Sequence, residues 1–168
     1  VKIDTFSYLP VQDFGNAYST FVAQNFGAKK YDRIRSGTKT AFFISGIFSI
    51  IISVSVFMFA SPLMKIFIDA SETQVIAAGV HYLRIEGAFY IGIGFLFLLY
   101  GYYRAIKKAG MSVILTVISL GTRVLLAYIL SAIDGIGVTG IWLAIPIGWV
   151  LADVTGLVYL KIINSICK

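Results

Sequence analysis

Long apolar stretches separated by short charged segments dominate the sequence. No charged residue occurs between Lys39 and Lys65, and AFFISGIFSIIISVSVFMFA (41–60) fills this interval. A helix of about 20 residues is about 30 Å long, which matches the hydrocarbon thickness of a membrane. Comparable stretches follow, so the pattern predicts an all-α membrane protein with five transmembrane helices. The expected spans are about 3–26, 40–60, 76–103, 111–132 and 140–160.

The first of these spans, 3–26, has a polar side. Its polar residues recur at intervals of three and four, which places them on one face of a helix. Inside a membrane protein such a face contacts other helices or a wet cavity, because unpaired polar groups are costly in lipid. We therefore predict that this face lines a substrate or ion pathway. The residues proposed for it are Gln12, Asp13, Asn16, Thr20 and Gln24.

Asp13 is the carboxylate of this face. A buried membrane carboxylate can take up and release a proton, or coordinate Na⁺ together with carbonyl oxygens. A structural role is the alternative, in which Asp13 bonds to Gln12 or Asn16, or caps a helix break after Pro10.

Composition agrees with a membrane protein and argues against several other classes. Hydrophobic residues make up 58% and charged residues 13% of the chain, whereas soluble domains are about a quarter charged. The net charge of +6 is then expected to set orientation in the membrane and not to bind nucleic acid. Lone Cys167 and lone His81 predict no internal disulfide and no metal site. No catalytic signature is present, so neither an enzyme nor a cofactor is expected.

Charge also predicts the orientation. The segments 27–40, 104–110 and 161–168 hold ten basic residues against Asp32, whereas the opposite ends hold Lys2 and Lys65 against four acids. The positive-inside bias therefore predicts that these three segments are cytoplasmic, where their cations face anionic membrane lipids. In this interpretation 27–40 is a loop, and Pro62 ends the second helix. The ten basic residues are Lys29, Lys30, Arg33, Arg35, Lys39, Arg104, Lys107, Lys108, Lys161 and Lys168.

Other ionisable residues also fall within the spans. Glu86 and Arg123 lie at similar depths if their helices are straight antiparallel neighbours, which predicts an intramembrane ion pair. Asp153 lies about eight residues from the inner end, where it could reach an aqueous vestibule, but we expect a structural role for it. Ser45, Ser49 and Ser53 recur every four residues and predict a small-residue face for close helix packing.

Three segments resemble the multidrug and toxic compound extrusion (MATE) family of transporters. They are FGNAYSTFVAQNFGAKKYDRIRSG (14–37), EGAFYIGIGFLFLLYGYYRAIKKAGMSVILTVISLGTRVLLAYIL (86–130) and GIGVTGIWLAIPIGWVLAD (135–153). The resemblance implies that residues 1–168 form helices eight to twelve, most of one six-helix lobe of a twelve-helix protein. The N-terminal lobe and helix seven would be its partners. The sequence begins at Val1, so we expect a fragment that does not transport alone.

The resemblance also implies a function and a location. Such proteins exchange H⁺ or Na⁺ for cationic or amphiphilic compounds by alternating access, here in a bacterial cytoplasmic membrane. The Asp that Na⁺-coupled members carry in their tenth helix has no clear counterpart, which leaves the coupling ion open. A lipid-linked oligosaccharide flippase of the same superfamily is an alternative. Its cavity would carry several cations, whereas the predicted face holds only Asp13. A non-transporting membrane scaffold is the third possibility.

Overall fold

Six helices make up the part of the chain that the structure, a computed structural model, describes: residues 2–166, with the side chains of residues 3–163. They are α1 (Lys2–Gly27), α2 (Tyr31–Phe67), α3 (Thr73–Gly87), α4 (Tyr90–Ala105), α5 (Ala109–Ser131) and α6 (Val138–Ile166). The architecture is all-helical, as predicted. Cys167 and Lys168, on which two of the sequence-based predictions fall, lie outside the described residues.

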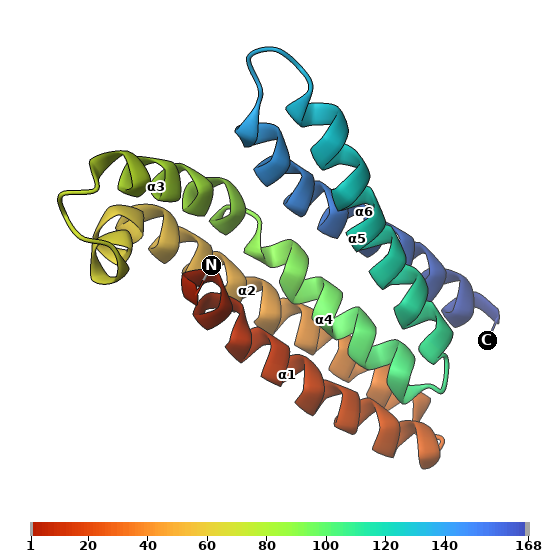
Figure 1. Cartoon of the computed structure of the whole chain (residues 1–168). Helices are drawn as coiled ribbons and strands as arrows, with labels where there is room; N and C mark the ends of the chain where they lie inside the picture. Colours follow the sequence, from red (N-terminus) through yellow and green to blue (C-terminus); the bar gives the residue numbers. More distant parts are fainter. Residues whose placement is uncertain (1, 167–168) are drawn as a thin grey trace.

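α4 lies at the centre of the arrangement. It contacts α1 and α2 on one side and the α5–α6 hairpin on the other (Figure 1). The main hydrophobic core surrounds it, with Leu98, Leu99 and Tyr103 packed against Val22 of α1 and Leu115 of α5. The hydroxyl of Tyr103 donates to the carbonyl of Gly156, which ties α4 to α6.

The outer surface is largely apolar. α2 exposes Phe43, Ile51 and Met58, and α5 exposes Val117 and Leu125. Outward-facing apolar side chains are what a lipid environment requires. α2, α5 and α6 are each long and apolar enough to cross a membrane, and so are α3 and α4 when counted as one bent span. α1 does not meet the same combined requirement, so its crossing stays a prediction.

The prediction of a loop over 27–40 and of a helix end at Pro62 is wrong. Only Ala28, Lys29 and Lys30 separate α1 from α2, with Lys29 in the left-handed region at φ 56°. α2 then runs unbroken for 37 residues with Pro62 inside it. A proline removes one backbone donor, and membrane helices tolerate this.

The predicted span 76–103 is divided in two. α3 and α4 meet at Ala88 and Phe89 with a bend of 51°. The amide of Phe89 donates to the carbonyl of Glu86 at 3.1 Å, and that of Gly92 donates to Phe89 at 2.9 Å. These i→i+3 bonds tighten the chain and redirect it without a proline.

The predicted small-residue face is confirmed for Ser45 and Ser49, which are buried against α4. A methyl group at Gly94 of α4 would lie 2.7 Å from the Ser49 hydroxyl, so the two helices approach closely here. Ser53 is only half-buried.

Candidate functional site

The polar side of α1 faces a surface that it shares with α4 and α5. Two adjoining hollows lie there, of about 300 Å³ and about 400 Å³, and both include Asn16 and Arg104. We call their joined lining the polar furrow. It consists of Gln12, Asn16, Ser19, Thr20, Ala23 and Gln24 from α1, Phe97, Tyr100, Arg104 and Ala105 from α4, and Ser112, Val113 and Thr116 from α5.

Helical periodicity explains how α1 presents these groups. Its opposite face buries Val11, Tyr18 and Val22, which leaves the residues spaced by four from Gln12 to Gln24 on the furrow side. Close contact with α4 fixes the helix in place. The hydroxyl of Ser19 donates to the carbonyl of Gly101 at 2.9 Å.

Gly101 permits this contact because it has no side chain. A methyl group there would lie 2.7 Å from the carbonyl oxygen of Gly15 and 3.2 Å from Cβ of Ser19. The furrow is thus held by backbone packing between α1 and α4 and not by polar contacts alone.

Arg104 is the charged residue of the furrow lining. Its Nη2 atom donates to Oδ1 of Asn16 at 3.3 Å, and its Nε atom donates to the carbonyl of Tyr100 at 3.3 Å. From the sequence, Arg104 was predicted only as a loop cation of the segment 104–110. The structure places it in the last turn of α4, level with the polar side of α1.

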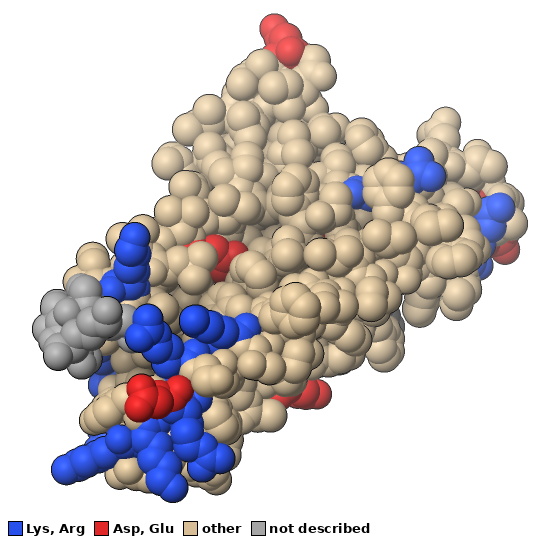
Figure 2. All heavy atoms as spheres, turned by 180° about the vertical axis from the view of Figure 1, so that it is seen from behind, with Lys and Arg blue, Asp and Glu red and all other residues tan. Residues whose placement is uncertain are grey.

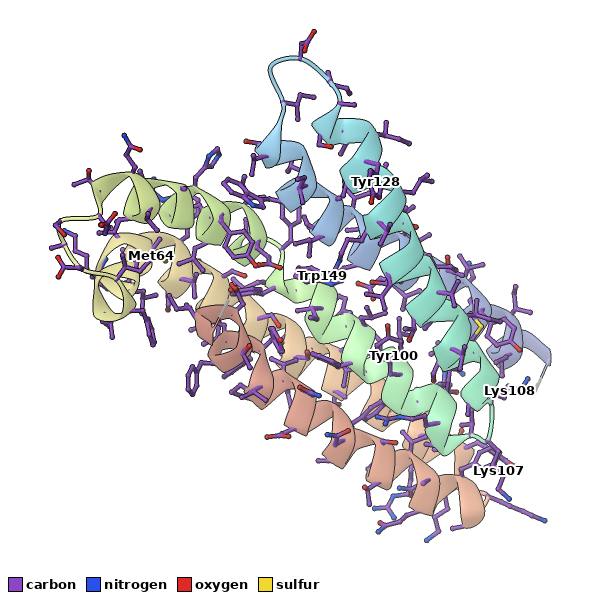
Figure 3. All side chains as sticks on the ribbon, viewed as in Figure 1. Met64, Tyr100, Lys107, Lys108, Tyr128 and Trp149 are labelled. Carbon is purple, nitrogen blue, oxygen red and sulfur yellow. The ribbon has the colours of Figure 1, made fainter. Side chains whose placement is uncertain are left out.

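α5 adds hydroxyl groups to the furrow that were not predicted from the sequence. The Ser112 hydroxyl donates to the carbonyl of Tyr100 at 3.3 Å, and the Thr116 hydroxyl donates to the carbonyl of Ser112 at 3.0 Å. Tyr100 lies between α4 and α5 (Figure 3). Ser112 and Thr116 are four residues apart, as are the polar residues of α1. This spacing could have predicted a polar face on α5 as well.

The structure places four of the five predicted pathway residues in the furrow and Asp13 elsewhere. Gln12, Asn16, Thr20 and Gln24 line it. Asp13 is exposed on α1 and lines neither hollow. The functional role of each of these residues stays a prediction.

The predicted ion pair between Glu86 and Arg123 is not seen as a direct contact among the described residues, although the two charges interact electrostatically, so the pair stays a prediction. Oε2 of Glu86 and Nε of Arg123 both lack a hydrogen-bond partner among the described residues. The prediction assumed one straight helix before α5. The bend at Ala88 instead directs α3 onto α2 and α6, whereas α5 packs on α4 and α6.

Two further ionisable residues of the spans, Asp153 and His81, lie next to residues of other helices. Asp153 is buried on α6, close to Gly92 of α4, and its Oδ1 atom has no hydrogen-bond partner among the described residues. The ring of His81 contacts that of Trp142, with 5.4 Å between centroids. No group of three or more His, Cys, Asp or Glu that could hold a metal occurs in the described part of the chain.

The sequence is similar to a known family and to proteins of that family. The family model described as MatE matches residues 1–129. Two curated relatives are the probable multidrug resistance protein YoeA of Bacillus subtilis and the probable multidrug resistance protein NorM of Thermotoga maritima. YoeA is 23% identical over 86% of this chain and 31% of its own length, and NorM is 22% identical over 85% and 31%. The chain therefore spans about a third of the length of these relatives.

Solved structures share the fold. An outward-facing multidrug resistance MATE family transporter superposes with a TM-score of 0.92 at 20% identity, over 99% of this chain and 37% of that one. An inward-facing structure gives 0.89 at 21% identity, over 98% and 38%. A third, from Pyrococcus furiosus, gives 0.90 at 21% identity, over 98% and 37%, and is described as having a binding pocket of reverse polarity that suggests a different function. With more than half of its residues matched by the family model, the chain belongs to the MatE family.

Proposed function

We propose that this chain is part of a secondary active multidrug efflux transporter. In this proposal an H⁺ or Na⁺ gradient drives export of cationic or amphiphilic compounds by alternating access. The polar furrow is the observation that carries the proposal. It joins the polar side of α1 to α4 and α5 in a fold found in both outward- and inward-facing MATE transporters.

The proposed pathway needs further chain. Because this chain spans about a third of its relatives' length, we expect transport to require an N-terminal lobe and helix seven. We also expect the basic segments around 27–40 and 104–110, and the tail 161–168, to face the cytoplasm of a bacterial cell. The described basic residues gather mainly at one end of the molecule, which supports this orientation (Figure 2).

Efflux of a cationic dye tests the proposal. Cells expressing the full-length gene product are loaded with dye, and efflux is followed with and without Na⁺ and with and without a proton gradient. We expect export under at least one of the two gradients. Absence of export of any cationic compound under either gradient would count against multidrug efflux.

The role predicted for Asp13 has its own test. If Asp13 binds the coupling ion or the substrate, Asp13→Asn removes the charge and transport is lost. Asp134→Asn in the exposed turn between α5 and α6 is a matched control. Unchanged efflux by the Asp13 variant would remove this residue from the pathway.

A second candidate function is movement of an anionic, lipid-linked oligosaccharide. The observation that favours it is charge, because Arg104 is the one charged residue among the described residues that line the furrow. Asp13, the acid expected to favour cations, does not line the furrow. Arg104→Gln separates the two functions, with Lys107→Gln in the next turn as the control. Loss of activity toward an anionic lipid-linked sugar supports the second candidate, and retained or increased export of a cationic dye supports the first.

A further inference from the structure

A separate hollow of about 480 Å³ lies at the end of the molecule where α1 joins α2 and where α4 and α6 finish. Three cations line it: Arg35 and Lys39 of α2, and Lys161 of α6. We call it the basic hollow. It shares no residue with the polar furrow, so it is a different site.

The three cations of the basic hollow lack an ionic partner within the described part of the chain. None of them forms an ion pair with a carboxylate of the described residues, and all three are exposed. Asp32 is the single acid of the lining. The hollow therefore has a surplus of positive charge, which is complementary to an anion.

Apolar side chains form the floor of the basic hollow. Tyr102 and Ile106 are buried at the end of α4, and Leu160 of α6 is half-buried. One turn before Leu160, α6 exposes Leu157 and Val158 at 40% and 54%. The apolar floor thus continues onto the outer apolar surface of α6.

The walls of the basic hollow are held in place. The hydroxyls of Tyr18 and Thr38 share a hydrogen bond of 2.7 Å, which fixes the start of α2 against α1. The Tyr103 hydroxyl donates to the carbonyl of Gly156 and fixes α6 against α4. The cations are therefore brought together by the fold, even though they come from two helices far apart in the sequence.

We propose that the basic hollow binds one anionic phospholipid. Its phosphate lies among Arg35, Lys39 and Lys161, and an acyl chain follows the apolar surface from Leu160 along α6. Lys and Arg at a membrane surface attract anionic headgroups, and a phosphate accepts several charge-assisted hydrogen bonds. A small soluble anion would use the cations but gain nothing from the apolar floor.

Lipid retention by the purified full-length gene product tests this site. The protein is held in micelles that contain phosphatidylglycerol and phosphatidylcholine, and bound lipid is counted by native mass spectrometry. We expect one retained phosphatidylglycerol per protein. The combined change Arg35→Gln, Lys39→Gln and Lys161→Gln is expected to weaken its binding at least about tenfold.

The matched control also removes three positive charges from the end of the molecule that carries the basic hollow. Lys29→Gln, Lys30→Gln and Arg33→Gln alter three cations of the α1–α2 turn and first turn of α2 that do not line the hollow. This variant should retain phosphatidylglycerol as the unaltered protein does. An equal loss in both variants, or no loss in either, would overturn the proposal.

A second measurement needs no substitution. In phosphatidylglycerol vesicles Lys39 and Lys161 should be protected from an amine-acetylating reagent, relative to Lys29 and Lys30, and this protection should be absent in phosphatidylcholine vesicles. Displacement of the lipid by millimolar inorganic phosphate would indicate a site for small anions and would also overturn the proposal.

Discussion

Replacing Gly101 by alanine would place a methyl group in a tight contact between α1 and α4. The new carbon would lie 2.7 Å from the carbonyl oxygen of Gly15. The obstacle is backbone, which cannot rotate away as a flexible side chain can, so the two helices must separate. That separation also lengthens the 2.9 Å hydrogen bond from Ser19 to the carbonyl of Gly101.

The loss in free energy of unfolding caused by Gly101→Ala can be worked out by comparison with Gly121→Ala. Gly121 lies on the exposed side of α5 and would bring its methyl group within 4 Å of nothing. Both changes gain about 1 kcal/mol in helix propensity, and this gain cancels in the comparison. Overpacking then costs about 1–3 kcal/mol at Gly101, and loss of the Ser19 hydrogen bond adds about 1 kcal/mol.

The assay is reversible unfolding of the gene product in mixed micelles as the fraction of SDS is raised, followed by tryptophan fluorescence. We expect Gly121→Ala to be as stable as the unaltered protein or slightly more stable. Gly101→Ala should have a free energy of unfolding about 2–4 kcal/mol below that of Gly121→Ala. Equal stability of the two variants would refute the close approach of α1 and α4.

Two further predictions concern charged groups. Because the charges of Glu86 and Arg123 interact without a direct contact, the coupling energy of Glu86→Gln and Arg123→Gln in a double-mutant cycle should be small, within about 0.5 kcal/mol. A larger coupling energy would indicate the direct ion pair and contradict the structure. In the α2–α3 turn, the amide and hydroxyl of Ser71 donate to Asp69 at 2.9 and 2.8 Å and hold the pKa of this carboxyl below its ordinary value. These bonds stabilise the folded protein fully at pH values above the ordinary pKa of Asp. The stabilisation is lost as the pH falls through the lowered pKa of Asp69, at about pH 4 and below. Ser71→Ala should raise the Asp69 pKa in a carbon-13 NMR titration, with Asp69→Asn identifying the signal, and an unchanged pKa would contradict these bonds.

Local periodicity explains what could be predicted from the sequence. Gln12, Asn16, Thr20 and Gln24 share a side of any α-helix, whatever surrounds it. Their location in a furrow was therefore predictable, whereas the partners were not. Arg104 meets Asn16 across 88 residues of sequence, and that contact depends on how α1 packs against α4.

The bend between α3 and α4 could not be predicted for a related reason. The segment around Ala88 and Phe89 contains no proline and continues an apolar run. The i→i+3 hydrogen bonds at Phe89 and Gly92 form there next to a close approach of α3 to α2, because a methyl group at Gly87 would lie 3.1 Å from Val56. The assumption of one straight helix is wrong there, so it gives no support to a direct contact between Glu86 and Arg123.

The length of α2 connects the membrane interior to the surface in a fixed angular register. Its 37 residues span about 55 Å, well beyond about 30 Å of hydrocarbon. No flexible joint separates the basic end of α2 from its apolar part. One residue inserted after Lys39 would therefore rotate Arg35 and Lys39 by about 100° relative to the apolar part of α2 and the helices packed against it. An insertion that a loop would absorb would here turn both cations away from Lys161.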